Sequence, residues 1–154
     1  MFISHSMEEH LMKDYIRKVN YHETDKMGIT HHSNYIKWME EARFDYLEQL
    51  NCGYSQLERQ GIISPVTAVK CKYKQPTTFA DVIAIHTEVE EFRGVKLKIK
   101  YTMTNVKTGK IVFTGITEHC FIDENGAPII LRKQFREFDR IIKEQLKTSK
   151  GIDK

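Results

Sequence analysis

Apolar side chains recur along this chain with two different periods, and the longer of the two is typical of a helix. Over residues 34–50 they return every three or four positions, at Tyr35, Met39, Ala42, Tyr46 and Leu50. This spacing places them on one face of a helix, and most charged residues fall outside that stripe. Ser33 or Asn34 can cap the start, and Gly53 follows the end. We therefore expect a helix of about 17 residues, roughly 25 Å long.

Most of the remaining chain alternates between apolar and polar residues, which is the period of a β-strand. The clearest case is the segment from Val95 to Met103, where lysines separate the apolar positions. The same period predicts one short strand and four long ones, at 15–21, 69–74, 81–92, 95–103 and 110–123. Each long strand is expected to have one dry face and one wet face. Further helical segments are expected at 55–60 and 131–147.

The order of these elements predicts the fold class. One long helix followed by long strands in hairpin succession favours an antiparallel sheet with segregated elements, the α+β class. The helix would cover the dry face of the sheet, and the twisted sheet can curl around it. Residues 14–148 are expected to form a single domain. The polar segment 1–13 precedes it and is expected to be flexible.

The composition excludes several classes of protein. The 24 lysines and arginines against 21 acidic residues leave a net charge of +3, too small for sequence-independent nucleic-acid binding. No window approaches the roughly 20 apolar residues of a membrane span, and the first residues do not resemble a secretory signal. Cys52, Cys71 and Cys120 are widely separated and form no Cys-x-x-Cys pair. Such cysteines are typical of reduced thiols, so we expect a cytoplasmic protein.

The segment that joins the first strand to the long helix carries the candidate chemistry. It reads Tyr-x-x-Thr-Asp-x-x-Gly-x-x-x-His-x-Asn-Tyr, from Tyr21 to Tyr35. Asp25 lies only seven or eight residues before the expected helix start, so its carboxylate can fold back towards the unpaired amides of the first turn. Those amides carry partial positive charge and can polarise a carbonyl oxygen. Taken alone, an aspartate in a loop ahead of a glycine is more often a turn residue.

The motif, which closes a strand and opens a long helix, resembles the 4-hydroxybenzoyl-CoA thioesterase family of hotdog proteins. Within that family it is most similar to the bacterial acyl-CoA thioesterases associated with the Tol-Pal system. The similarity extends over roughly residues 14–124 and includes Glu40-Glu41-Ala42-Arg43 in the helix. Glu23 stands where that subgroup commonly has a second aspartate, which leaves the local hydrogen bonding open. The resemblance implies a hotdog fold, with an antiparallel sheet of about five strands wrapped around one long central helix.

Carried over residue by residue, the resemblance implies hydrolysis of an acyl-CoA thioester, with catalytic parts for Asp25, His32 and Tyr21. Asp25 would attack the thioester carbonyl or direct a water to it, and both routes stay open. The His32 amide is the expected oxyanion donor, while the His32 ring and the Tyr21 hydroxyl would position Asp25, water or substrate. Gly28 would allow the backbone conformation that the loop needs, and Asn34 would line the substrate site.

Coenzyme A carries several phosphates, so cations are expected near the mouth of the site. The resemblance points to Arg93 and Lys96 for this part, although the alternating lysines would serve equally as a solvated outer face of the sheet. No cofactor is expected, because CoA is part of the substrate. A cluster of residues of metal-ligating type also occurs in the motif: His22, Glu23, Asp25, His31 and His32. Adjacent members of it point apart, and we expect no metal site.

Two other functions stay open at this point. One is a thioesterase that acts on acyl-carrier protein, and the other is a hotdog domain that binds acyl-CoA without turning it over. The open edges of a single sheet invite pairing, and the resemblance implies a homodimer or homotetramer formed in this way.

Overall fold

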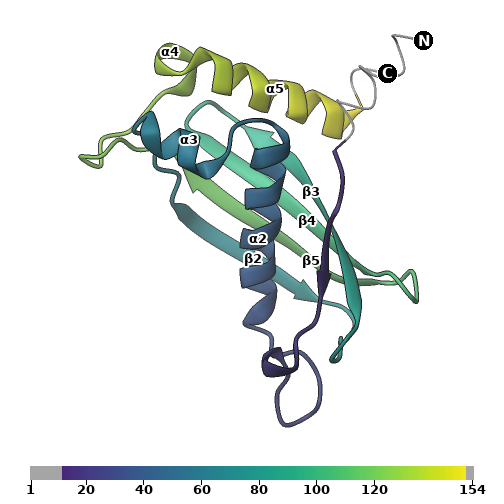
Figure 1. The fold of residues 1–154 in the computed structure, drawn as a ribbon. Helices are drawn as coiled ribbons and strands as arrows, with labels where there is room; N and C mark the ends of the chain where they lie inside the picture. Colours follow the sequence, from purple (N-terminus) through teal and green to yellow (C-terminus); the bar gives the residue numbers. More distant parts are fainter. Residues whose placement is uncertain (1–11, 152–154) are drawn as a thin grey trace.

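The computed structural model describes residues 12–151 and contains one five-stranded antiparallel sheet (Figure 1). Across the sheet the strands follow the order β1-β3-β4-β5-β2, so β1 and β2 form its two edges. Their bounds are Tyr15–Lys18 for β1, Val66–Tyr73 for β2, Val82–Phe92 for β3, Lys96–Asn105 for β4 and Ile111–Cys120 for β5. The four long strands predicted from the alternating pattern are confirmed, as is the antiparallel arrangement.

The helices fall close to the predicted positions. The long helix predicted from the apolar stripe is α2, Asn34–Gln49, and the short turn after it is α3, Tyr54–Arg59. A short 3-10 helix, η1, covers Tyr21–Glu23. The C-terminal helix is divided into α4, Leu131–Gln134, and α5, Arg136–Lys150, because the backbone of Phe135 is not helical. Its prediction as one helix over 131–147 was therefore wrong at this break, and α5 continues three residues further.

The core lies between α2 and the inner face of the sheet. α2 buries Tyr35, Trp38, Met39, Ala42 and Tyr46, which include four of the five residues of the predicted stripe. Helix and sheet approach closely at Gly115 of β5, where an added Cβ would lie only 2.5 Å from the sulfur of Met39. A side chain at this position would push the helix away, so the glycine allows the close packing.

The edge strand β2 departs from its prediction. Its expected dry face remains open in the single chain, with Val69 40% and Tyr73 49% exposed, and the strand also begins three residues before the predicted start, at Val66. The reason for the open face is the position of α2, whose contacts with the sheet lie mainly on β3 and β1. Alternation with a period of two residues indicates which side chains share a face of the sheet. It does not indicate whether a neighbouring element covers that face.

The first strand is also shorter than predicted. β1 ends at Lys18, because the next residue, Val19, already exchanges backbone hydrogen bonds with the loop before β3: its amide donates to Asp81 and its carbonyl accepts from Ala80. Tyr21 consequently belongs to η1 and not to a strand. Residues 1–11 of the predicted flexible segment lie outside the described residues. Lys13 exchanges two hydrogen bonds with the side chain of Gln49, at 2.8 and 2.9 Å.

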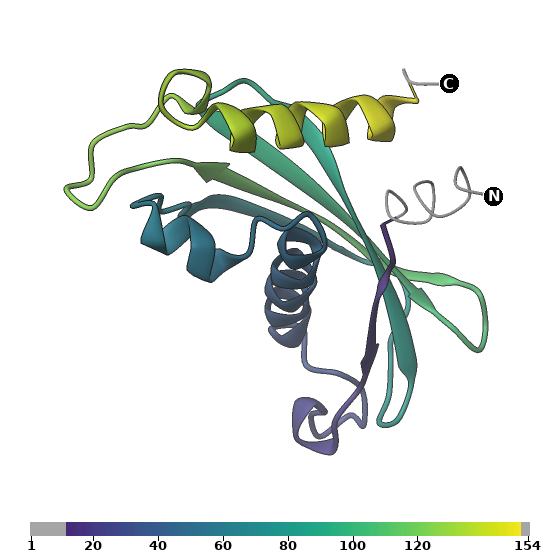
Figure 2. The same cartoon turned by 45° about the horizontal axis from the view of Figure 1, so that its top comes forward.

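The motif segment and the C-terminal helices lie at opposite ends of α2. In Figures 1 and 2 the loop after η1 extends from the helix start, whereas α3, α4 and α5 lie near the helix end. None of the helices described between residues 12 and 151 combines the length and the apolar character that a membrane span requires.

Candidate active site

The motif segment folds into a small hairpin at the N-terminal end of α2. Thr24 and Thr30 form an isolated antiparallel bridge, and between them the Asp25 amide donates to the Ile29 carbonyl at 2.9 Å. The Gly28 amide donates to the Asp25 carbonyl at 2.9 Å, and Gly28 has a φ of +78°. This left-handed conformation strains any residue with a Cβ, and it is the backbone conformation expected for Gly28; a part of Gly28 in substrate binding stays a prediction.

The Asp25 carboxylate lies in the turn of this hairpin and is half-buried. One oxygen, Oδ1, accepts a hydrogen bond from the Met27 amide at 2.9 Å, which is the geometry of an Asx turn. Within residues 12–151 the other oxygen receives no hydrogen bond. Asp25 is therefore a turn residue, as its local sequence suggests, and it also keeps one carboxylate oxygen available for chemistry.

Glu23, two residues earlier, is the polar centre that holds the segment in place. It is 3% exposed, and the Arg17 guanidinium binds both of its oxygens, at 2.7 and 2.8 Å. The Trp38 indole nitrogen and the Asn20 amide each donate a further bond, at 2.8 Å. Burial raises the pKa of the Glu23 carboxyl, but these donors outweigh burial, and the resulting pKa lies below the ordinary value.

Asn34, the first residue of α2, is buried and serves the backbone of the loop. Its side-chain nitrogen donates to the carbonyl of Glu23 at 2.9 Å and to that of His31 at 3.2 Å, and its own amide donates to His31 at 3.0 Å. Asn34 is predicted to line the substrate site, and its side-chain nitrogen is bonded here within the chain. These bonds fix the peptide plane between His31 and His32, whose N–H group is the expected oxyanion donor. No hydrogen-bond acceptor for that N–H is present in the described part of the chain.

His32 is exposed, and its surroundings come from β2 as well as from the loop. Its ring stacks on that of His31 with the centroids 4.3 Å apart. The Tyr73 hydroxyl donates to the His32 carbonyl at 3.1 Å, and burial raises the pKa of Tyr73 to about 12, so this hydroxyl stays protonated. From the sequence, Tyr73 was only part of the strand predicted over 69–74. Nothing in its local pattern indicates a contact with a residue 41 positions away.

Tyr21 is not joined to this group in the single chain. Its side chain is 76% exposed and packs edge-on against Phe79, with ring centroids 5.8 Å apart. Among residues 12–151, no hydrogen bond connects the side chains of Tyr21, Asp25 and His32 with one another. The structure therefore places the three predicted catalytic residues in one segment without assembling them into a hydrogen-bonded triad.

Arg93 and Lys96, the predicted phosphate-binding cations, lie at the other end of the molecule. They flank the turn between β3 and β4, and the Gly94 carbonyl in this turn accepts a bond from the start of α4. Both side chains are exposed and face carboxylates, Arg93 pairing with Glu91 and Lys96 lying 3.6 Å from Glu118. An 11-residue strand separates this turn from the motif end of the sheet. One chain alone does not bring these cations to Asp25.

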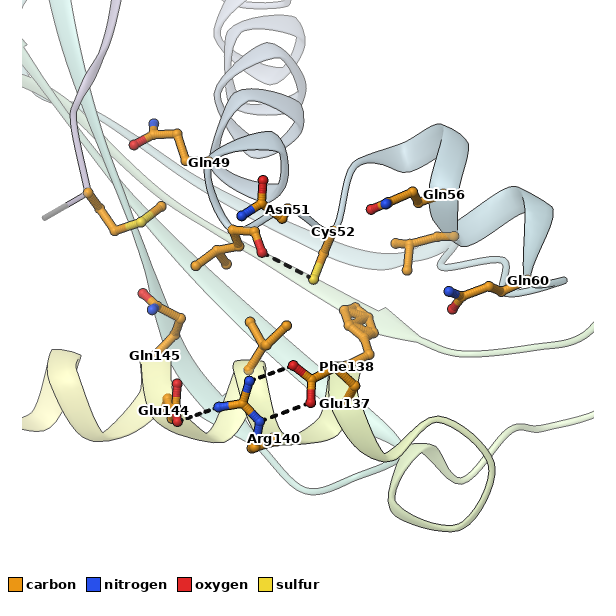
Figure 3. A pocket seen from close by; sticks show the side chains of 14 residues that line it. Gln49, Asn51, Cys52, Gln56, Gln60, Glu137, Phe138, Arg140, Glu144 and Gln145 are labelled. Carbon is orange, nitrogen blue, oxygen red and sulfur yellow. Dashed lines mark hydrogen bonds and ion pairs between the residues drawn. The ribbon is translucent and has the colours of Figure 1, made fainter. Parts of the chain in front are cut away.

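A cavity of about 780 Å³ also lies away from Asp25, between the end of α2, α3 and α5 (Figure 3). Its wall carries several amides, and Arg140 of α5 pairs there with Glu137 and Glu144. Cys52 lines this cavity, and burial raises the pKa of its thiol, which disfavours the nucleophilic thiolate. Over residues 12–151, no three His, Cys, Asp or Glu side chains form a group suited to a metal ion.

Comparison with known proteins identifies the family. The family model described as the thioesterase-like superfamily matches residues 19–146, which include the motif hairpin, α2 and the whole of β2 to β5. The chain belongs to the thioesterase-like superfamily. Among curated members of related sequence, the Bacillus subtilis protein YneP, an acyl-CoA thioesterase by name, is 35% identical over 122 residues. That match covers 79% of this chain and 88% of YneP.

Solved structures of thioesterases have the same fold. The DHNA-CoA thioesterase of Staphylococcus aureus is 34% identical, has a TM-score of 0.84 and matches 90% of this chain and 94% of its own. The gentisyl-coenzyme A thioesterase BH1999 is 27% identical, has a TM-score of 0.72 and matches 80% of this chain and 99% of its own. The five-stranded antiparallel sheet with its helices is therefore the hotdog arrangement of this superfamily.

Proposed function

We propose that this protein is an acyl-CoA thioesterase in which Asp25 acts on the thioester at the N-terminal end of α2. The observation that carries the proposal is the presence of two available groups in one short segment, residues 25–32. Asp25 has a carboxylate oxygen without a partner in the described chain, and the His32 amide has no acceptor there. The names of the relatives, which include CoA thioesterases with acyl and aromatic substrates, support the reaction class.

In this mechanism the thioester carbonyl oxygen accepts a hydrogen bond from the His32 amide. As charge develops on that oxygen, the amide and the partial positive charge of the helix start stabilise it, an effect of about 10² to 10³ in rate for one such donor. Asp25 either accepts a proton from a water that attacks the carbonyl carbon or attacks the carbon itself to form an anhydride that water then opens. The C–S bond breaks, the CoA sulfur takes up a proton, and the free acid is released.

Asn34 and Tyr73 are positioning residues in this scheme. Asn34 donates two bonds to the carbonyl of the peptide whose N–H belongs to His32, which orients and polarises that N–H. Tyr73 holds the next carbonyl along the chain. The His32 ring and Tyr21 stay candidates for contacts with substrate, because both are exposed beside the hairpin.

At a finer level we propose a member of the 4-hydroxybenzoyl-CoA thioesterase family, similar to the Tol-Pal-associated enzymes, with α2 as the central helix of the hotdog. We also propose a cytoplasmic location. The three cysteines, Cys52, Cys71 and Cys120, form no disulfide with one another in the structure, as in proteins of reducing compartments. No cofactor is proposed, because CoA belongs to the substrate.

A homodimer through the β2 edge completes the proposal, with a tetramer as its further assembly. β2 is an edge strand of eight residues with an open inner face, and exposed edges of this kind favour pairing with another strand. A second copy is also a source for the phosphate-binding cations that one chain does not bring to Asp25. Light scattering at micromolar protein should give at least twice the mass of one chain. A monomeric mass would overturn this part of the proposal.

The reaction is tested with purified protein and a panel of acyl-CoA thioesters, with release of the CoA thiol followed by a thiol reagent. Wild-type protein should hydrolyse members of the panel, and Asp25→Asn should lower kcat/KM by about 10² to 10⁴, the range for removal of a general base. Unchanged activity in Asp25→Asn would contradict the catalytic role of Asp25. Acyl-carrier protein loaded with the same acyl group is the comparison that identifies the preferred carrier.

A further inference from the structure

The ring of His31 is bound to the residue before α2 by two hydrogen bonds at one nitrogen. Its Nδ1 accepts a bond from the Ser33 backbone amide at 3.2 Å, and the Ser33 hydroxyl oxygen lies 2.8 Å from the same nitrogen. A backbone amide can only donate, so Nδ1 carries no proton and the hydroxyl donates to it as well. In this arrangement the His31 ring is neutral, with its proton on Nε2.

This contact fixes the backbone on the C-terminal side of His32. The peptide before His32 is held at its carbonyl, which accepts two bonds from Asn34. The peptide after His32 is held at both ends, because its carbonyl accepts from the Tyr73 hydroxyl at 3.1 Å and its N–H group is that of Ser33. The His32 amide, the proposed oxyanion donor, belongs to the first peptide and is joined to the second through one Cα atom. Its direction therefore depends on both.

His31 also restricts the side chain of His32. The two rings stack with centroids 4.3 Å apart and planes inclined by 30°. The Tyr73 ring meets His32 edge-on, with centroids 6.2 Å apart. The exposed His32 ring is thus contacted by one ring from its own loop and one from β2, which limits its orientations.

A proton on His31 would break the bond to the Ser33 amide. A charged imidazole carries N–H groups on both nitrogens, so Nδ1 can no longer accept. The Ser33 hydroxyl can turn and accept from the new N–H group, but the Ser33 amide cannot. Histidine is the side chain that ordinarily changes charge between about pH 5 and pH 8, and His31 is exposed to solvent.

Several other ionisable groups surround this contact. They come from the motif segment, β2 and β1: Asp25, His32, Glu23, Tyr73 and Arg17. The raised pKa of Tyr73, about 12, keeps its hydroxyl neutral over this range, and the lowered pKa of Glu23 keeps its carboxylate charged. The groups whose titration must be separated from that of His31 are therefore His32 and Asp25.

We propose that His31 is a positioning residue of the reaction, which fixes the His32 amide in its neutral form and releases the adjoining peptide when it takes up a proton. This inference rests on the proposed thioesterase function and names a control of the same site. An amide that stabilises developing charge on the thioester oxygen acts in the transition state. Loss of its orientation therefore lowers kcat and leaves KM little changed.

The test compares three single variants with the wild type. His31→Asn keeps an acceptor at the same place, because its side-chain oxygen is bonded to Cγ as Nδ1 is, but it has no group that titrates. His31→Phe keeps a ring to stack on His32 and lacks the acceptor. His22→Asn is the matched control, because it removes another exposed histidine of the same segment. Circular dichroism establishes that each variant keeps the fold.

kcat and KM are measured between about pH 5 and pH 8 with one acyl-CoA that the wild type hydrolyses. At the upper end, His31→Phe should lower kcat by about two- to tenfold, the effect of one hydrogen bond, while His31→Asn stays close to the wild type. Towards the lower end, His31→Asn should lose less kcat than the wild type. His22→Asn should keep the wild-type profile.

Nuclear magnetic resonance gives a readout that does not depend on activity. The resonance of the Ser33 amide should follow the titration of the His31 ring in the wild type, and this step should disappear in His31→Asn. Wild-type kcat in His31→Phe, or a Ser33 amide that does not follow His31, would overturn this inference alone. Failure of the wild type to hydrolyse any acyl-CoA would overturn the proposed function instead.

Discussion

Glu23 and Asp25 are carboxylates separated by one residue, yet the protein surrounds them in opposite ways. Glu23 is 3% exposed, and both of its oxygens are bound by Arg17, with Trp38 and Asn20 as further donors. Asp25 is half-buried and accepts a single bond from the Met27 amide. One carboxylate thus holds the segment in place, and the other keeps an available oxygen.

This difference separates structural from chemical use of the same functional group. A carboxylate whose lone pairs are all engaged by buried donors cannot approach a substrate without breaking those bonds. It can, however, hold its backbone still, and the Glu23 carbonyl accepts bonds from the His31 amide and from Asn34. Glu23 therefore positions the peptide that presents the His32 amide, whereas the proposed chemistry belongs to Asp25.

The largest stability effect is expected for Glu23→Gln. Removing one partner of a buried ion pair costs about 3 kcal/mol or more, because Arg17 keeps its charge in a largely buried position. For a chain of this size that corresponds to a decrease of about 6–12 °C in melting temperature. Glu41→Gln is the matched control, since Glu41 also binds Arg17, at 3.1 Å, but has a more exposed side chain. Equal losses in the two variants, measured by calorimetry, would remove the special role of Glu23.

Two buried groups should make stability depend on pH in separate windows. The pKa of His119 is lowered to about 4 in the fold, against about 6.5 in an unfolded chain. Its unfolded form takes up a proton first as the pH falls, so the free energy of unfolding should decrease by up to about 1.4 kcal/mol per unit between these values. The pKa of Glu23 is also lowered, and its contribution is present above about 4.3 and is lost below that.

Urea unfolding of the wild type and two variants at a series of pH values checks both windows. In His119→Gln, the free energy of unfolding should depend less on pH above pH 4. In Glu23→Gln, it should depend less on pH below pH 4. A wild-type stability that stays constant from pH 7 to pH 4 would contradict the buried, neutral state of His119.

A smaller effect is expected for Tyr73→Phe. The variant loses the hydrogen bond to the His32 carbonyl, and such a bond contributes about 1 kcal/mol. This hydrogen bond positions the His32 amide, the proposed oxyanion donor, and does not contact Asp25. We therefore expect kcat to fall several-fold, while the melting temperature changes little. A loss of activity as large as that of Asp25→Asn would mean that the Tyr73 hydroxyl itself contacts the reacting atoms.

The parts of the fold that depend on local pattern could be predicted from the sequence. α2 follows from the stripe of Tyr35, Met39, Ala42 and Tyr46, because a helix of this length needs one apolar face to pack. The long strands follow from strict alternation, and the conformation of Gly28 follows from its place in a tight hairpin. The break at Phe135 lies inside a continuous apolar pattern, so periodicity alone could not reveal it.

The parts of the site that depend on distant partners could not be predicted. The sequence indicated no structural role for Glu23, because its partners Arg17 and Trp38 meet it through the packing of β1 and α2. The contact of Tyr73 with His32 depends on where β2 ends beside the loop. Arg93 lies far from the motif because of the direction of β3. The residues near the turn do not reveal this direction.

The central claim is that Asp25 performs chemistry while Glu23 holds the loop, and one assay tests it directly. Acyl-CoA hydrolysis is measured for Asp25→Asn and Glu23→Gln at a temperature where circular dichroism shows both variants fully folded. We expect Glu23→Gln to keep most of the wild-type kcat/KM and Asp25→Asn to lose about 10² or more of it. If the folded Glu23→Gln protein were inactive while Asp25→Asn retained wild-type activity, the assignment of the two carboxylates would be wrong.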